Sequence, residues 1–410
     1  MKKAIITGVT GQDGSHMVDY LLANTDIGII AGVRRLSVKN HENIKHLKDN
    51  SRFRLIDLDI TDQSNVDRII AEEKPDYFIN FAANSFVGVS WDMPENHMNT
   101  NCMAVLYQLE AIRKHCPDCH YYNAGSSEEF GDVVTAPQDE THPLRPRSPY
   151  GASKAAARHL VKVWRDSYNL YAIQGWLFNH EGTRRGEEFL TRKVTKGVAR
   201  IVKEIRGGET PVPLELGNLE AKRDWSDAED FVHGIWLMLN QDLESPNEYV
   251  LASGETYTIR EFVEAAFGFA GFGSDQCYWV GEHSQSKYYH GNQLLVEINP
   301  KYYRPAEVEL LLGDPTRAEK ELSWKRKTDF LGLVKKMVDT ISIYDIVIPC
   351  LEVKRNANHA ESLLGRESQL ALAVICFQKP NQRKRRNPSL RKERNLSRGC
   401  FQAINLKTYS

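Results

Sequence analysis

Cysteine is scarce in this 410-residue chain, and long apolar runs are missing from it. Its 7 cysteines form an odd, scattered set, unlike the dense and even framework of a disulfide-stapled domain, so reduced thiols are expected. The longest apolar run, 370–377, is much shorter than the roughly 18–20 residues of a membrane span. These absences exclude a stapled mini-protein and argue against a membrane-spanning helix, so we expect a soluble protein.

Two of the cysteines, Cys116 and Cys119, are spaced as C-x-x-C. No second pair and no histidine cluster stands at zinc-finger distance, and the pair falls at an expected helix-to-strand junction. A structural loop is therefore favoured over a metal or redox role, and no metal site is predicted. At the N-terminus, the β-rich run 3–7 leads straight into glycines rather than into a cleavage site, so we expect no signal peptide and a cytoplasmic location.

Net charge is almost absent, at −1, but the two ends of the chain differ. Residues 343–410 contain 13 Lys and Arg against 5 Asp and Glu, which leaves 40 against 49 in residues 1–342. An acidic body is thus followed by a basic tail with a run of four cations at 383–386. An incidental extension is the favoured interpretation of this tail. A nucleic-acid or nuclear-localisation patch and a partner-binding arm are the alternatives.

What the sequence does contain is a succession of β-α-β units. Short β-branched or aromatic runs predict strands at 3–7, 28–33, 53–56, 77–81, 120–123 and 171–177. Amphipathic segments between them predict helices at 14–22, 63–72, 100–115 and 151–168. This alternation predicts an α/β fold with a doubly wound parallel sheet of the Rossmann type, in which ligands bind at the carboxyl ends of the strands.

The alternation loosens from about residue 183. Helices are predicted there at 189–205, 227–239, 259–270 and 328–340, around a Gly/Pro-rich stretch at 207–213. We therefore predict a Rossmann domain at 1–182 and a smaller α+β substrate domain mainly at 183–342, with part of 214–250 returning to the large sheet. The basic extension at 343–410 is assigned no role.

A glycine-rich turn joins the first predicted strand to the first predicted helix, with the sequence Thr7-Gly8-Val9-Thr10-Gly11-Gln12-Asp13-Gly14. Glycines there allow a tight turn and a close approach to a pyrophosphate, and the helix N-terminus directs amide donors at anionic oxygens. A bare structural turn is the alternative. The predicted dinucleotide contacts are Gly8, Thr10, Gly11, Gln12, Asp13 and Gly14.

The end of the second strand indicates which dinucleotide is bound. An acidic residue there would bind the ribose 2′-hydroxyl of NAD, whereas Arg34 and Arg35 suit the 2′-phosphate of NADP. NADP is therefore predicted, and surface arginines without this role are the alternative. Further cofactor contacts are predicted after the third and fourth strands, at Asp59, Ile60, Phe81, Ala82, Ala83 and Ser85.

Tyr150 and Lys154 stand four residues apart, on one face of a predicted helix. An ammonium lowers the pKa of a nearby phenol, so the tyrosinate can accept a hydroxyl proton while hydride leaves the same carbon. Ser126 can hydrogen-bond the reacting oxygen. Glu128 can take the acidic C–H proton beside a transient ketone, which converts oxidation into elimination. An exposed loop carboxylate is the alternative for Glu128, and Glu129 is interpreted as a bystander.

These motifs resemble those of an extended short-chain dehydrogenase/reductase, and within that superfamily the GDP-mannose 4,6-dehydratase family, over roughly residues 1–342. The resemblance includes the glycine-rich turn, Ala82-Ala83-Asn84-Ser85 and the stretch 146–151. Its most specific parts are LFNHEGTRRGE at 177–187, GNLEAKRDW at 217–225 and YRPAEV at 303–308.

The resemblance implies a catalytic set of Ser126, Glu128, Tyr150 and Lys154, with Ser126 where many members have Thr. It implies cofactor contacts from Tyr150, Lys154, His180 and Arg185. It implies substrate contacts from Ser85, Ser126, Glu128, Asn179, Lys193, Gly217, Arg223, Arg304 and Glu307. The implied activity is that of a hydro-lyase acting on GDP-mannose, with hydride passing from C4 to NADP and back to C6 on the route to GDP-fucose and related deoxysugars. A homodimer or homotetramer is also implied.

Two segments, 125–130 and 226–231, depart from the commonest dehydratase forms and lean toward the reductase of the 4-keto product. That reductase, or a related sugar-nucleotide epimerase or dehydratase, is the alternative function. Three other segments favour the dehydratase: the turn with Gln12-Asp13, the pair Arg184-Arg185, and 303–308 with Arg304 and Glu307. A non-catalytic NADP-binding regulator is a remoter alternative, which the intact Tyr150 and Lys154 disfavour.

Overall fold

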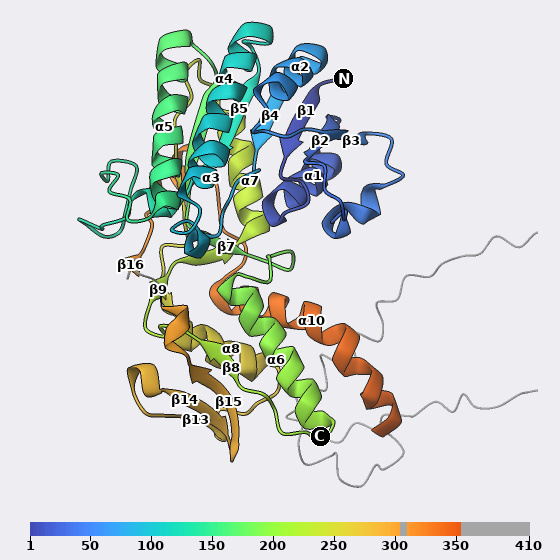
Figure 1. The fold of residues 1–410 in the computed structure, drawn as a ribbon, viewed down its shortest axis with the longest axis vertical. Helices are drawn as coiled ribbons and strands as arrows, with labels where there is room; N and C mark the ends of the chain where they lie inside the picture. Colours follow the sequence, from blue (N-terminus) through green and yellow to red (C-terminus); the bar gives the residue numbers. More distant parts are fainter. Residues whose placement is uncertain (304–309, 354–410) are drawn as a thin grey trace, which may run out of the picture. The chain divides into compact units, whose positions relative to one another are not determined.

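Seven parallel strands form the large sheet, in the order β11-β6-β5-β4-β1-β2-β3 (Figure 1). The computed structural model describes residues 1–303 and 310–353, with side chains as far as residue 341. The strands are β1 (Lys3–Thr7), β2 (Gly28–Val33), β3 (Phe53–Asp57), β4 (Tyr77–Asn80), β5 (His120–Ala124), β6 (Ala172–Leu177) and β11 (Val250–Leu251). The six strands expected from the sequence all form, with ends that differ by one residue at most. The predicted doubly wound fold is therefore confirmed.

Helices cover both faces of this sheet, and the alternation of side chains along β1 shows why. Ala4 and Ile6 pack into the core beneath α1 (Gln12–Asn24) and α7 (Ala228–Leu239), whereas Ile5 packs into the core beneath α2, α4 and α5. The last three helices are α2 (Gln63–Glu73), α4 (Ala104–His115) and α5 (Pro149–Tyr168). Both faces are thus buried, and the carboxyl ends of the strands are left to form a site.

The helix predicted at 100–115 begins earlier and is interrupted. Pro94 starts α3 (Pro94–Met98), a π-helical turn follows at Asn99–Met103, and α4 continues from Ala104. Within the turn, the buried Asn101 side chain accepts from the backbone N–H of Asn84 (2.9 Å) and donates to Ser153 Oγ (3.1 Å). The irregular turn thus ties the segment after β4 to α5.

The second lobe is built around aromatic residues, with Phe262, Phe267 and Phe330 in its core. Its helices are α6 (Leu190–Arg206), α8 (Ile259–Phe269) and α10 (Phe330–Val353), and its four-stranded sheet has the order β13-β14-β15-β8. Those strands are β13 (Cys277–Val280), β14 (Lys287–His290), β15 (Gln293–Ile298) and β8 (Leu214–Leu216). Shorter elements connect the lobes: β7 (Asn179–Glu181), β9 (Lys222–Arg223), β10 (Trp225–Asp227), β12 (Tyr257–Thr258), β16 (Leu310–Leu311) and α9 (Thr316–Glu321).

Part of 214–250 was expected to return to the large sheet, and α7 and β11 are the elements that do so, while 214–216 belongs to the small sheet as β8. Met1–Cys350 form one compact unit, and α10 runs to Val353, so the boundary placed after 342 falls inside a helix. The cluster at 383–386 lies outside the described residues.

Two further features bear on the expectations from composition. Cys116 and Cys119 are both free thiols in the turn between α4 and β5. No helix in the described part of the chain combines the length and the apolar character that a membrane crossing requires.

Candidate active site

One cavity of about 1400 Å³ lies at the carboxyl ends of the large sheet's strands and extends to the second lobe. Every predicted site residue that the structure describes lines it. They are Gly8, Thr10, Gly11, Gln12, Asp13, Gly14, Arg34, Arg35, Asp59, Ile60, Phe81, Ala82, Ala83, Ser85, Ser126, Glu128, Tyr150, Lys154, Asn179, His180, Arg185, Lys193, Gly217 and Arg223. Arg304 and Glu307 lie outside the described residues. The volume exceeds the ~300–1,000 Å³ typical of one small-molecule site, so there is room for two nucleotides.

In the glycine-rich turn after β1, the backbone packs closely against the backbone of neighbouring segments. Gly8 has a φ of +70°, and a Cβ on it would lie 2.7 Å from the backbone nitrogen of Ala82. A Cβ on Gly14 would lie 2.4 Å from the carbonyl oxygen of Gly8. Gly11, the N-cap of α1, has no side chain to cover the helix N-terminus, which faces the cavity. This cradle fits a pyrophosphate.

We expect Gly14→Ala to weaken both folding and dinucleotide binding. Its Cβ would meet backbone that cannot rotate away, so the turn must shift, at a cost of about 1–3 kcal/mol. The matched control is Gly268→Ala in α8, where a Cβ meets nothing within 4 Å and a gain of up to about 1 kcal/mol is expected. Urea unfolding and cofactor titration of both variants measure this, and a Gly14→Ala protein as stable as the control contradicts it.

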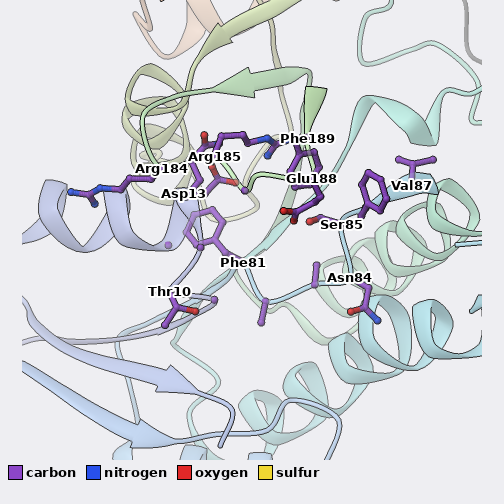
Figure 2. Close-up of a pocket in the computed structure, with 18 of the residues that line it drawn as sticks. Thr10, Asp13, Phe81, Asn84, Ser85, Val87, Arg184, Arg185, Glu188 and Phe189 are labelled. Carbon is purple, nitrogen blue, oxygen red and sulfur yellow. Dashed lines mark hydrogen bonds between the residues drawn. The ribbon is translucent and has the colours of Figure 1, made fainter. Parts of the chain in front are cut away.

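A charged cluster stands beside this turn (Figure 2). Asp13 Oδ2 lies 3.0 Å from His180 Nε2, and His180 Nδ1 lies 2.8 Å from the carbonyl oxygen of Phe178. Burial would raise the pKa of Asp13, but His180 and Arg185 outweigh burial and hold that pKa well below its ordinary value. Both ring nitrogens of His180 are thus engaged within the protein, and its observed contact is with Asp13.

Arg184 and Arg185 diverge from the loop after β7. Figure 2 shows Arg184 pointing toward α1, where it donates to Asp19 Oδ2 (2.6 Å), and Arg185 pointing toward Phe189. The Arg185 guanidinium lies 3.6 Å from the centroid of that ring and pairs with Glu181 at 3.0 Å. Arg185 therefore lines the cavity, and the cofactor contact implied for it stays a prediction, while Arg184 ties the loop to α1.

The two arginines at the end of β2 are exposed and line the cavity. In the part of the chain that the structure describes, neither Arg34 nor Arg35 makes an ion pair. The neighbouring Asp59 carboxylate is engaged locally, because its Oδ1 accepts from the backbone N–H and the hydroxyl of Thr61. Two cationic side chains without an acidic partner at this position suit a phosphate.

The chemistry-bearing residues come from η4 (Ser127–Glu129), its N-cap Ser126, and the first turns of α5. Ser126 makes a side-chain hydrogen bond to Tyr150. Lys154 Nζ donates to the carbonyl oxygen of Ala124 at 2.7 Å, and it lies 6.0 Å from the centroid of the Tyr150 ring. Glu128 is half-buried, lines the same cavity and acts electrostatically on Tyr150.

The electrostatics of this group differ from the sequence expectation in one respect. Burial raises the pKa of Tyr150 well above its usual range, against the hydrogen bond from Ser126. Burial also lowers the pKa of Lys154 to about 8, although the carboxylates of Glu129 and Asp13 act in the opposite direction. The lowering of the phenol pKa that we expected from Lys154 is therefore outweighed by burial of the phenol.

The wall contributed by the second lobe is polar and cationic. Asn179 Oδ1 is buried without a hydrogen-bond partner among the described residues, and Lys193 Nζ lies 3.6 Å from the centroid of the Tyr302 ring. Sequence reasoning missed Arg192, which also lines the cavity. Its Nη1 is buried without a hydrogen-bond partner in the described part of the chain, and burial lowers the pKa of Arg192. Its only sequence signal was its position next to Lys193. Such groups suit a second, anionic ligand.

A doubly wound sheet, a glycine cradle and a Ser126-Tyr150-Lys154 group in one large cavity define the short-chain dehydrogenase/reductase class. Comparison with known proteins agrees. The family model of GDP-mannose 4,6 dehydratase matches residues 5–337. A GDP-mannose 4,6 dehydratase of Drosophila melanogaster is 42% identical over 82% of this chain and 85% of its own. That of Homo sapiens is 40% identical over 82% and 90%.

Solved structures agree on the fold. UDP-glucose 4-epimerase of Thermus thermophilus, in complex with NAD, is 25% identical with a TM-score of 0.66, covering 83% of this chain and 98% of its own. dTDP-glucose 4,6-dehydratase of Bacillus anthracis is 21% identical with a TM-score of 0.67, covering 84% and 97%. The chain belongs to the GDP-mannose 4,6-dehydratase family.

Proposed function

We propose that this protein is a hydro-lyase that converts GDP-mannose to GDP-4-dehydro-6-deoxy-mannose and water. The observation that carries the proposal is the placement of Glu128 in one cavity with Ser126, Tyr150 and Lys154. A reductase needs only the last three, whereas elimination also needs a base for a C–H proton. Family membership and relatives of that name at about 40% identity in animals and bacteria support the same function.

Each residue then has a defined task. Tyr150 accepts the C4 hydroxyl proton, and Ser126, already hydrogen-bonded to Tyr150, holds the reacting oxygen. Lys154 supplies positive charge beneath the phenol. Glu128 takes the C5 proton and passes a proton to the hydroxyl that leaves C6 as water. As hydride returns to C6, Tyr150 gives the proton it took from the C4 hydroxyl to C5. The cationic wall with Lys193 faces the diphosphate of the sugar nucleotide.

The cofactor that these residues fit is a nicotinamide dinucleotide, and we propose that it is NADP. When bound, it takes a hydride from C4 and returns it to C6, so there is no net redox change. The glycine-rich turn suits its pyrophosphate, and Arg34 and Arg35, which make no ion pair with any residue that the structure describes, suit its 2′-phosphate. NAD in the complex of the Thermus thermophilus epimerase supports the cofactor class.

Replacing both Arg34 and Arg35 by Ala tests the choice of NADP. The loss of two charge-assisted contacts should weaken NADP binding by roughly 10- to 100-fold and leave NAD binding unchanged. Titration with each dinucleotide measures the ratio. The control is Lys48→Ala, because Lys48 is an exposed cation that does not line the cavity. Equal weakening of NAD and NADP would contradict the assignment.

We also propose that the chain acts as a homodimer or homotetramer, as its family resemblance implies. Val163 and Tyr168 on α5 are apolar and about half exposed, at 47% and 48%, which supports a surface covered by a second copy. Light scattering at assay concentration tests this, and a monomer contradicts it.

The direct assay is incubation of GDP-mannose with the enzyme and NADP. The expected result is a keto sugar lighter by one water, without accumulation of NADPH. Stoichiometric NADPH contradicts the dehydratase, and activity only on the keto sugar with added NADPH would identify the reductase.

A further inference from the structure

Glu129, which the sequence suggested was a bystander, is fully buried directly behind the catalytic group. Its side chain is 0% exposed, and that of Arg158 on α5 is 4% exposed. Glu129 Oε1 accepts from the backbone N–H of Ser126 at 2.8 Å, and Glu129 Oε2 pairs with Arg158 Nε. One carboxylate thus joins the loop of Ser126 and Glu128 to the helix of Tyr150 and Lys154.

Arg158 is well placed for this role, because it follows Lys154 by one helical turn. Its guanidinium lies 3.4 Å from the centroid of the Trp176 ring and donates through Nη1 to the carbonyl oxygen of Gln174 (2.6 Å) and to Glu248 Oε2 (3.1 Å). Gly125 leaves the space: a Cβ there would lie 2.8 Å from Glu129 Oε1 and 2.9 Å from Arg158 Nη2. The pair is therefore held through Nε and Nη1 of Arg158, while Nη2 is buried without a hydrogen-bond partner among the described residues.

A row of buried side chains connects this pair to the cofactor turn across four adjacent strands. Gln174 Nε2 donates to Glu129 Oε1 (3.0 Å) and to the carbonyl oxygen of Lys154 (2.9 Å). From Gln174 the row continues through Asn123 (2.6 Å), Asn80 (2.8 Å) and Thr7 (2.6 Å). Each neighbouring pair also stands in register in β6, β5, β4 and β1. A continuous polar row thus underlies the strand ends that carry the site.

We propose that Glu129 is a positioning residue for the reaction: through its buried pair with Arg158 it fixes the Ser126–Glu128 loop against α5 and sets the charge beneath Tyr150 and Lys154. This inference rests on the proposed function. Glu129 does not line the cavity, so it acts through its neighbours and not on the substrate.

The sign of its electrostatic effect follows from the groups that face the two residues. Tyr150 is faced by Ser126, Glu128, Glu129 and Arg185, and Lys154 is faced by Glu129 and Asp13. The negative charge of Glu129 raises the pKa of Tyr150 and the pKa of Lys154 alike. Glu129→Gln should therefore lower both pKa values, and both changes move the pH profile toward acid.

The test is the pH profile of GDP-mannose turnover with NADP, measured on the full chain. For Glu129→Gln we expect the acidic limb of kcat/KM to move about one unit lower, with kcat at the optimum roughly 10-fold reduced and cofactor affinity unchanged. The double variant Glu129→Gln with Arg158→Gln removes one charge of each sign. Because the two electrostatic effects then cancel, the acidic limb of its kcat/KM profile should lie at the wild-type pH.

The matched control is Glu248→Gln, which takes the same kind of carboxylate from the same Arg158 but has no contact with Ser126. Its limb should not move. If Glu129→Gln fails to fold by circular dichroism, Arg158→Gln replaces it, and the limb should then move to higher pH because Glu129 loses its guanidinium.

Three outcomes are decisive. The inference is overturned if the acidic limb of kcat/KM does not shift in the folded Glu129 or Arg158 variant. It is also overturned if Glu248→Gln shifts that limb equally. In both cases wild-type turnover of GDP-mannose still supports the proposed function. A wild type that does not turn over GDP-mannose contradicts the proposed function and this inference with it.

Discussion

Glu128→Gln is expected to reduce kcat for GDP-mannose dehydration by about 1000-fold, within the range attributed to a positioned general base. The amide keeps the size of the carboxylate but cannot take the C5 proton. NADP binding should stay within about twofold of the wild type, because the dinucleotide cradle is built from the glycine turn and not from η4.

A second readout isolates the C–H step. In deuterated water the wild type should place solvent deuterium at C5 of the product, because the proton taken from C5 leaves with the water and C5 is reprotonated from Tyr150, whose proton exchanges with solvent. Glu128→Gln should not incorporate deuterium there. Asp132→Asn is the control: it is an exposed carboxylate four residues later that pairs with Arg147 outside the cavity lining. Wild-type turnover in Glu128→Gln would remove Glu128 from the mechanism.

Tyr150→Phe should lower kcat by about 1000-fold or more, because it removes the group that we propose takes the C4 hydroxyl proton. The ring stays packed, since Tyr150 is 7% exposed and its ring lies 6.4 Å, edge-on, from that of His97. The melting temperature and the affinity for GDP-mannose should therefore change little.

Tyr168→Phe provides the comparison on the same helix, at its far end, where the side chain is 48% exposed. It should behave as the wild type, because Tyr168 does not line the cavity and the substitution keeps the ring that we propose a second copy covers. A Tyr150→Phe enzyme that retains more than about a tenth of wild-type kcat would show that another group accepts the C4 proton.

The central strands of the large sheet were predictable because they are short runs buried on both faces, as in Tyr77–Asn80, where all four residues are buried. The edge strand Phe53–Asp57 is more exposed, and its β-branched and aromatic residues were its signal. The second lobe was not. Strands such as Lys222–Arg223 and Tyr257–Thr258 have two residues each, which is too short for any periodicity. They form because Arg223 pairs in register with Tyr257, a contact between distant segments.

Those site residues that belong to local sequence motifs could be predicted. The glycine turn, Tyr150 and Lys154 carry their chemistry in local spacing, and the structure brings them into one cavity. Glu128 and Glu129 show the limit of such reasoning. They are adjacent and chemically alike, and only the tertiary position of Arg158 decides that Glu129 turns inward. The polar row from Thr7 to Gln174 likewise depends on strand order.

The most direct test of the proposed activity is a label at the carbon that is oxidised. GDP-mannose carrying deuterium at C4 should yield GDP-4-dehydro-6-deoxy-mannose with that deuterium at C6, in a reaction that needs only catalytic amounts of NADP. Nuclear magnetic resonance of the product reads the position. Deuterium recovered in free NADPH or in water, with none at C6, would contradict an internal transfer and with it the dehydratase activity.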